Sequence, residues 1–170
     1  GLDYLEFDQW RYSNLLESHN QVIYGRYSVS PYINFKVYDP KPRTITALQF
    51  RDRVVQRAIY NYIQPIFEKT FLPNSYACRK GKGTHLAAKI TQYFMSIDRG
   101  ILWGVIDRKI GCKKTKSLIE KFVPRYGVGI NIGELLSQLF ANVFGNQVDM
   151  FIKQKLKVKC FLRYMDDIVI

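Results

Sequence analysis

The sequence predicts a fold of the α/β class, more narrowly α+β, in which helices and short antiparallel strands form one compact unit with two lobes. Apolar residues recur at helical spacing over long stretches, and short β-rich runs come in pairs joined by turn signals. No internal repeat or linker interrupts the chain. With 170 residues, 47% of them hydrophobic and 24% charged, the chain can bury a sizeable core.

The N-terminal part is predicted to contain a helix followed by a hairpin. Asp8 can cap a first helix that runs to about His19. Residues 33–38 and 43–48 are expected to pair as strands, because a turn signal, Asp-Pro-Lys-Pro, separates them at 39–42. The loop of this hairpin carries two basic residues, Lys41 and Arg43.

Helical periodicity marks three further segments. Residues 51–67 carry apolar side chains at helical spacing, and a second helix is expected to begin near Asp98 and continue through Ile106. The longest periodic stretch follows Gly133 and extends to Ile152 as one broad apolar stripe. This last segment should be a buried helix.

The final residues form the second predicted hairpin. Two short β-rich runs, 160–164 and 168–170, are separated only by Met165, Asp166 and Asp167. The sequence therefore places two acids at the turn of a hairpin.

The net charge of +12 is concentrated in one third of the chain. Residues 36–89 hold 11 basic and 3 acidic side chains, an excess of +8. A basic region beside a nearly neutral one is expected where a phosphate-binding lobe joins a chemical lobe. A solubilising surface explains the same charge equally well.

Membrane and secreted proteins are disfavoured. No apolar run is long enough to cross a bilayer, and the first ten residues are acidic and aromatic where a secretory leader would be basic and then apolar. Cys78, Cys112 and Cys160 lack any paired spacing, which indicates reduced thiols. We therefore expect a cytoplasmic protein.

Asp166 and Asp167 are the first candidates for chemistry. Adjacent carboxylates between apolar strands are costly unless a positive group binds them, since like charges raise one another's pKa and resist burial. A Mg²⁺ ion, which prefers hard oxygen ligands, meets that requirement. An ordinary solvated turn would explain the dipeptide alone, so its context decides.

That context resembles a known family. Residues 164–167, Tyr-Met-Asp-Asp, resemble the YxDD box of reverse transcriptases, and three upstream blocks agree with that family in order. They are RDRVVQRAI at 51–59, SYACRKGKGTH at 75–85 and GINIGELLSQLFANVFGNQVD at 129–149. The resemblance covers essentially the whole chain.

The resemblance implies a right-hand polymerase fold without a thumb. Residues 1–88 would form the fingers lobe. Residues 89–170 would form a partial palm lobe, in which an antiparallel sheet packs on helices and carries the YMDD hairpin.

The block at 129–149 narrows the resemblance. This chain has Ile132-Gly133 and Ser137-Gln138 where the more usual retroviral and intron pattern has Gln-Gly and Ser-Pro. The pattern resembles reverse transcriptases of diversity-generating retroelements, which copy a template RNA with adenine-directed errors. Because Ile132 replaces a hydrogen-bonding Gln, we expect it to hold the template less tightly.

The family resemblance also implies the chemistry and the residues that carry it. A primer 3′-hydroxyl would attack the α-phosphate of a dNTP, with two Mg²⁺ ions, or Mn²⁺ in their place, held by Asp166 and Asp167. Nucleotide-binding residues would be Arg79, Lys41, Arg43, Phe94, Gly133 and Gln138, and nucleic-acid-binding residues would be Arg53, Arg57, Lys80, Lys82, Ile132 and Ser137. Phe94 could equally be a core aromatic, and the basic loop around Arg79 a solvated one.

One expected acid is missing. The family carries an Asp five residues before the second of two aromatics, here Phe94, and that count lands on Lys89. Asp98 resembles the family's non-catalytic Asp and is expected to cap the following helix. Because the chain lacks the third carboxylate and the thumb, we expect little or no primer extension from it.

The implied partners are template RNA, a primer–template duplex, dNTPs and a small basic pentameric accessory protein. Two alternatives remain open at this point. The chain could belong to a retron, intron or phage-defence reverse transcriptase, or it could be a non-catalytic RNA-binding module.

Overall fold

A computed structural model describes residues 2–38, 43–73, 75, 90–164 and 167–170. The helices are α1 (Leu2–Gln9), α2 (Arg11–Ile23), α3 (Phe50–Glu68), α4 (Ile90–Ser96), α5 (Arg99–Lys109), α6 (Lys113–Phe122) and α7 (Leu135–Gln154). The strands are β1 (Ile33–Val37), β2 (Arg43–Ala47), β3 (Leu162–Tyr164) and β4 (Asp167–Val169). Helices and two small antiparallel sheets make up the described chain, which agrees with the predicted α+β class.

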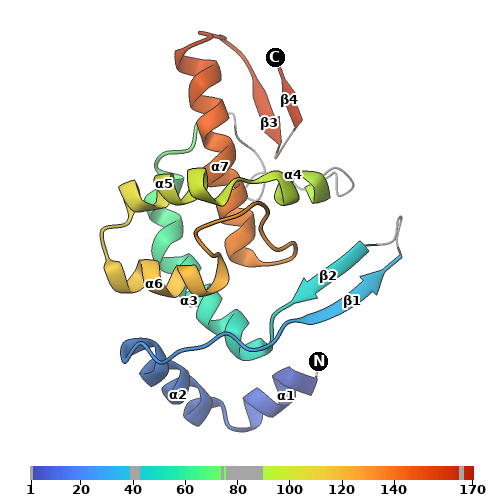
Figure 1. Cartoon of the computed structure of the whole chain (residues 1–170), viewed down its shortest axis with the longest axis vertical. Coiled ribbons are helices and arrows are strands. Elements are labelled where there is room, and N and C mark those ends of the chain that lie inside the picture. Colours follow the sequence, from blue (N-terminus) through green and yellow to red (C-terminus); the bar gives the residue numbers. More distant parts are fainter. Residues whose placement is uncertain (1, 39–42, 74, 76–89, 165–166) are drawn as a thin grey trace.

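The centre of the molecule is the pair of long helices α3 and α7, and α5 also packs on α7 (Figure 1). The β1–β2 hairpin extends from one end of this centre, next to α1 and α2, and the β3–β4 hairpin lies beside α7 at the other end (Figure 1). In this view α4 lies between the two hairpins (Figure 1).

The buried faces of the central helices follow the predicted periodicity. In α3 the buried apolar residues are Val55, Ile59, Ile63 and Phe67, and in α7 they include Leu136, Leu139, Phe140, Val143 and Ile152. The helices predicted for 51–67 and after Gly133 are confirmed. The apolar stripe is narrower than expected towards the end of α7, where Val148 and Phe151 are 41% and 54% exposed.

The first hairpin is confirmed to within one residue at each strand. Strand β1 pairs antiparallel with β2 from Ile33 opposite Ala47 to Val37 opposite Arg43. Arg43 is the first residue of β2 rather than part of the loop.

The N-terminal helix differs from the prediction. Asp8 lies inside α1 and does not cap a helix; its carboxylate accepts a hydrogen bond from Nε of Arg11 at 2.6 Å. The helix is interrupted at Trp10, and α2 begins at Arg11 without a side-chain cap. Local charge pairing of Asp8 with Arg11 therefore replaces the expected capping interaction.

The remaining helices are partly as expected. Asp98 caps α5, because its carboxylate accepts a hydrogen bond from the amide of Ile101 at 2.9 Å, as predicted. Helices α4 and α6 were not predicted. None of the described helices combines the length and the apolar character that a membrane span requires.

Candidate active site and nucleic-acid interface

The acidic hairpin forms as predicted. Strands β3 and β4 pair antiparallel, with Arg163 opposite Ile168 and Tyr164 opposite Asp167. Asp167 is half-buried at the start of β4, while Met165 and Asp166 lie outside the described residues. Asp167, the second of the two predicted acids, therefore lies at the end of the β3–β4 hairpin, opposite Tyr164.

A buried ion pair fastens this hairpin to the long helix. Arg163 donates from Nε to Oδ1 of Asp149 at 2.7 Å and from Nη2 to Oδ2 at 2.8 Å, and it also donates to Oγ of Ser75 at 3.0 Å. Arg163 is 1% exposed and Asp149 is fully buried. Such a two-pronged contact fixes orientation as well as charge, so it holds β3 at a defined place on α7.

Gly145 provides the space that Arg163 occupies. A Cβ atom at Gly145 would lie 2.5 Å from Nη1 of Arg163 and 2.8 Å from the hydroxyl of Tyr93. Tyr93 is itself held, because its hydroxyl donates to the carbonyl of Ala141 at 2.8 Å. Neither neighbour can move away without breaking a hydrogen bond, which in the case of Arg163 is buried.

Two glycine-to-alanine substitutions should therefore have opposite effects. Gly145→Ala should lower the free energy of unfolding by about 1–3 kcal/mol through overpacking. Gly104→Ala in α5, where a Cβ would meet nothing within 4 Å, should raise it by about 0.5–1 kcal/mol through helix propensity. Urea denaturation of both variants checks this, and stabilisation by Gly145→Ala would contradict the close packing described.

A second feature is a groove of about 520 Å³ between β2, the first half of α3 and the start of α7. Three of the residues predicted to bind nucleotide or nucleic acid line it: Arg53, Arg57 and Gly133. Gly133 has a φ of +96°, a conformation that side-chain-bearing residues rarely adopt. The structure therefore brings these three predicted residues to one surface.

The two arginines of the groove differ in their surroundings. Arg53 donates from Nη2 to Asp3 at 2.8 Å and lies over the ring of Phe50. Arg57 is exposed, with its guanidinium carbon 5.8 Å from the centroid of the Tyr60 ring. Arg57 is thus the groove arginine that is better placed to meet a phosphate.

The floor of the groove contains a polar cluster that sequence reasoning missed. Gln56 is 2% exposed, and its Oε1 accepts the amide of Leu135 at 3.0 Å, which caps the first turn of α7. Its Nε2 donates to Oε2 of Glu134 at 2.7 Å, and Asn131 donates to Oε1 at 2.7 Å. A side chain of the 51–59 block therefore fixes the start of the 129–149 block.

Glu134 has an unusual environment within this cluster. Burial raises the pKa of its carboxyl above the ordinary value, although hydrogen bonds from Asn131, Gln56 and Tyr32 oppose that shift. The hydrogen bonds all come from neutral groups. The carboxylate lies at the N-terminus of α7, where the helix dipole also favours negative charge.

Several other predicted residues do not reach a surface. Phe94 is 2% exposed and belongs to the hydrophobic core, which agrees with the core-aromatic alternative. Ser137 is fully buried inside α7, and its hydroxyl has no hydrogen-bond partner among the described residues. Neither side chain is exposed in the structure, while Ile132 and Gln138 are half-buried.

The remaining predicted residues lie outside the described residues or have side chains that are not described. They are Lys41, Arg43, Arg79, Lys80, Lys82, Lys89 and Asp166. Among the described residues, no three His, Cys, Asp or Glu side chains gather at metal-binding distance. The described part of the hairpin contributes one carboxylate, Asp167, so it does not by itself make up a magnesium site.

No family model matches the chain. It is 28% identical over 145 residues to the group II intron-encoded protein LtrA of Lactococcus lactis subsp. cremoris, an alignment that covers 70% of this chain and 24% of that protein.

The chain resembles intron-encoded proteins. It is also 25% identical over 159 residues to nuclear intron maturase 2, mitochondrial, of Arabidopsis thaliana, covering 84% of this chain and 19% of the maturase. A third relative is protein YkfC of Escherichia coli K12, 24% identical over 172 residues, covering 83% of this chain and 44% of YkfC. The chain spans less than half the length of these relatives.

These distant relatives support a reverse-transcriptase-like chain related to intron-encoded proteins. They do not single out the diversity-generating subtype. The similarity extends over most of this chain, which agrees with the spread of the four sequence blocks from 51 to 167.

Proposed function

We propose that the chain is the fingers and part of the palm of an RNA-directed DNA polymerase. The observation that carries this proposal is the YMDD hairpin, whose β3 strand is fastened through Arg163 to Asp149 of the long glycine-led helix α7. Because this ion pair holds β3 on α7, Asp167 in the paired strand β4 has a defined position relative to Gly133, which lines the groove at the start of the same helix. Catalysis by nucleotidyl transfer depends on this kind of positioning.

In this proposal the residues of the groove bind the duplex and the acids of the hairpin bind the metal ion. Arg57 would neutralise the backbone of a primer–template duplex, and Gly133 would let that duplex approach the start of α7. Asp166 and Asp167 would hold Mg²⁺, which stabilises the charge that develops on phosphoryl transfer. Lys89, where the family carries a further acid, is one reason to expect weak activity from this chain.

The test is Mg²⁺-dependent extension of a DNA primer on an RNA template by the chain and by Lys89→Asp. We expect almost no extension by the chain, measurable extension by Lys89→Asp, and none by Lys89→Asn or by Lys89→Asp combined with Asp166→Asn. Robust extension by the unaltered chain would contradict the role assigned to the missing acid. Failure of all variants to bind the duplex would contradict the function itself.

We further propose the diversity-generating subtype, with template RNA and a small basic pentameric protein as partners. The support is the residue pattern Ile132-Gly133 and Ser137-Gln138. In an extension-competent form, Ile132→Gln should reduce misincorporation opposite adenine, and an unchanged error spectrum would defeat the assignment. A neighbouring gene with adenine-confined variation would support it.

A non-catalytic RNA-binding role is the second candidate. Lys89 in place of the expected acid favours it, as does similarity to a protein named as an intron maturase. Duplex or RNA binding without extension by Lys89→Asp would distinguish this role from the polymerase.

A further inference from the structure

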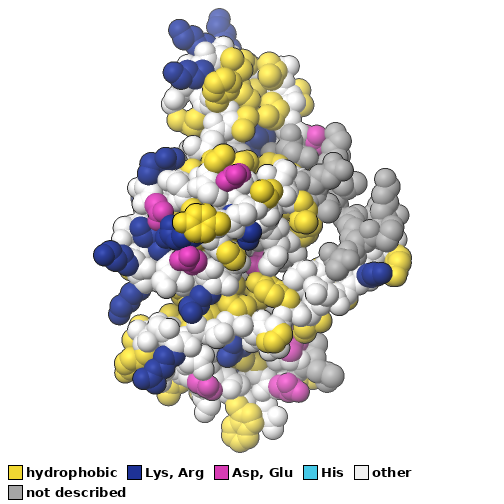
Figure 2. All heavy atoms as spheres, in the orientation of Figure 1, with side chains coloured by type: hydrophobic (Ala, Val, Ile, Leu, Met, Phe, Trp, Pro, Cys, Tyr) yellow, Lys and Arg dark blue, Asp and Glu magenta, His cyan; other side chains and the backbone are white. Residues whose placement is uncertain are grey.

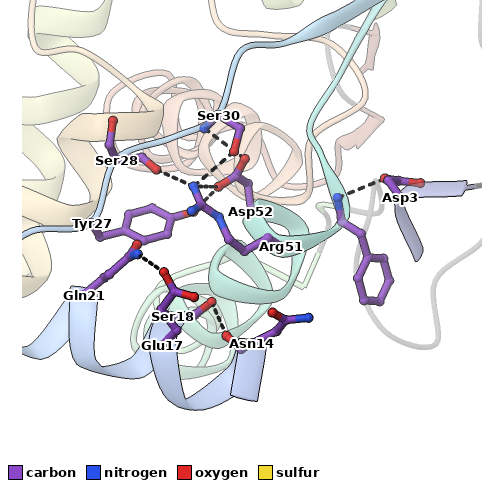
Figure 3. Close-up of polar contacts among 11 residues, drawn as sticks. Asp3, Asn14, Glu17, Ser18, Gln21, Tyr27, Ser28, Ser30, Arg51 and Asp52 are labelled. Carbon is purple, nitrogen blue, oxygen red and sulfur yellow. Dashed lines mark hydrogen bonds and ion pairs between the residues drawn. The ribbon is translucent and has the colours of Figure 1, made fainter. Parts of the chain in front are cut away.

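A cleft of about 780 Å³ lies between α2 and the segment 24–30 that follows it. Helix α2 contributes Ser13, Glu17 and Gln21 to its lining, and α3 contributes Arg51. Glu17, Gln21 and Arg51 are shown in Figure 3. Arg51 and Arg53 are two positions apart and so point to different sides of α3. The cleft is therefore separate from the groove that Arg53 and Arg57 line.

The end of α2 fixes two side chains at the cleft. The amide of Arg26 donates to the carbonyl of Gln21 at 2.8 Å and that of Gly25 to Val22 at 3.2 Å, the hydrogen-bond pattern of a Schellman motif. Gly25 has the positive φ, +71°, that this motif requires. As a result Tyr24 is 70% exposed, and the guanidinium carbon of Arg26 lies 5.8 Å from the centroid of its ring.

Arg51 is a preorganised cation in the same cleft (Figure 3). Its Nη2 donates to the carbonyl of Ser28 at 2.7 Å, to Oγ of Ser30 at 3.0 Å and to Oδ1 of Asp52 at 3.2 Å. The guanidinium also lies over the ring of Tyr27. Its side chain remains 32% exposed, whereas Asp52 is fully buried, so the cleft presents the cation and not its counter-ion.

The surface of the cleft presents more cations than anions. Arg26 and Arg51 line it together with one acid, Glu17, which accepts a hydrogen bond from Nε2 of Gln21 at 2.9 Å. Asp52, the ion-pair partner of Arg51, offsets part of its charge but is fully buried and does not line the cleft. The other polar lining groups are hydroxyls and amides. An exposed aromatic ring beside two cations and a row of hydroxyls matches the chemistry of a nucleotide: a base, phosphates and ribose hydroxyls.

We propose that this cleft binds single-stranded RNA. One base stacks on Tyr24, the adjacent phosphates lie between Arg26 and Arg51, and the hydroxyls of Ser13 and Ser28 contact the 2′-hydroxyls that distinguish RNA from DNA. The site goes beyond the proposed polymerase function, because it lies outside the groove and involves no residue of the YMDD hairpin. It would bind RNA even in a chain that does not polymerise.

The experiment measures binding of a fluorescent 12-nucleotide RNA to the full chain by anisotropy over a salt series. Tyr24→Ala should weaken binding roughly 5- to 100-fold, the range that base–aromatic stacking provides. Arg26→Gln should weaken binding and reduce the salt slope by about 0.7. Both side chains are exposed, so neither substitution should change the unfolding midpoint.

Matched controls come from exposed residues outside the cleft. Tyr12→Ala, at a residue that is 87% exposed in α2, and Arg108→Gln, in the last turn of α5, should change the Kd less than twofold. Equal losses for Tyr24→Ala and Tyr12→Ala would overturn the proposal. Equal affinity for single-stranded DNA, or tighter binding of duplex RNA, would also overturn it.

The outcome is separable from that of the polymerase proposal. Arg57→Gln should weaken binding of an RNA–DNA duplex and leave single-stranded RNA binding unchanged, while Tyr24→Ala should do the reverse. Loss of single-stranded RNA binding in Arg57→Gln but not in Tyr24→Ala would overturn the assignment to the cleft and leave the groove as the RNA site.

Discussion

Replacing Asp149 by asparagine should lower the free energy of unfolding by about 3–5 kcal/mol, because it leaves the buried guanidinium of Arg163 without its charged partner. Arg163 is 1% exposed and cannot turn to water without pulling β3 away from α7. Urea denaturation at neutral pH measures the loss. The YMDD hairpin should become more susceptible to proteolysis in the same variant, since the ion pair fastens one of its two strands.

Two further variants isolate the buried pair. Asp3→Asn breaks the pair between Asp3 and Arg53, whose side chains are 30% and 53% exposed, and should cost about 1 kcal/mol or less. Arg163→Met combined with Asp149→Leu replaces both charges by apolar groups and should recover most of the lost stability. If Asp149→Asn costs no more than Asp3→Asn, the ion pair does not hold the hairpin.

The long elements of the fold could be predicted because their residues alternate between core and solvent at a regular period. Helices α3, α5 and α7 and all four strands were expected close to where they occur. In the three helices the buried apolar side chains recur at the helical period, whereas β1 and β4, which are largely exposed, were predicted from the turn residues beside them. The segment 160–164 also shows the strand period of two, with Phe161 and Arg163 buried and Leu162 exposed.

The short elements were missed because local signals there are weak. Helix α6 has ten residues, six of them Lys, Glu or Ser, and its buried residues are Ile119 and Phe122. The break between α1 and α2 at Trp10 carries no Pro or Gly. Tertiary packing decides such boundaries, and a single sequence gives little information about it.

The sequence blocks of the candidate site could be predicted, but the contacts between those blocks could not. Arg53, Arg57 and Gly133 were predicted as binding residues, and the structure places them in one groove. It did not reveal that Gln56 caps α7, a contact between residues 79 positions apart. Hydrogen bonds between distant polar residues leave no periodic pattern.

One missed contact did have a signal in the sequence. Asp149 is the one acidic residue of α7 and is buried there, and a buried carboxylate needs a cation or several donors. Arg163, the inward-facing basic residue of a short strand, is the complementary signal. An acidic and a basic residue that are both expected to be buried are therefore candidates for an ion pair with each other.

The second large effect is expected from Asp52→Ala at the opposite end of the molecule. Asp52 is fully buried and accepts hydrogen bonds from the hydroxyl of Tyr27, the amide of Ser30 and Nη2 of Arg51 (Figure 3). Truncation leaves at least two buried donors without an acceptor, each worth about 1–3 kcal/mol, so the free energy of unfolding should fall by roughly 2–6 kcal/mol. Urea denaturation measures this fall, and Tyr27→Phe, which removes one donor and keeps the carboxylate, should cost less.

The same variant separates a structural role for this acid from a metal-binding one. Asp52 belongs to the block at 51–59, which resembles a block of a polymerase family, so its carboxylate could be interpreted as a metal ligand. Lys and Arg side chains are numerous on the molecule's surface (Figure 2), whereas Asp52 is fully buried. Its hydrogen bonds to Tyr27 and Ser30 instead tie the segment 24–30 to α3. The stability difference between Asp52→Ala and the unaltered chain should therefore be the same with and without Mg²⁺. A difference that grows when Mg²⁺ is added would show that the carboxylate serves the ion, and the structural role would then be wrong.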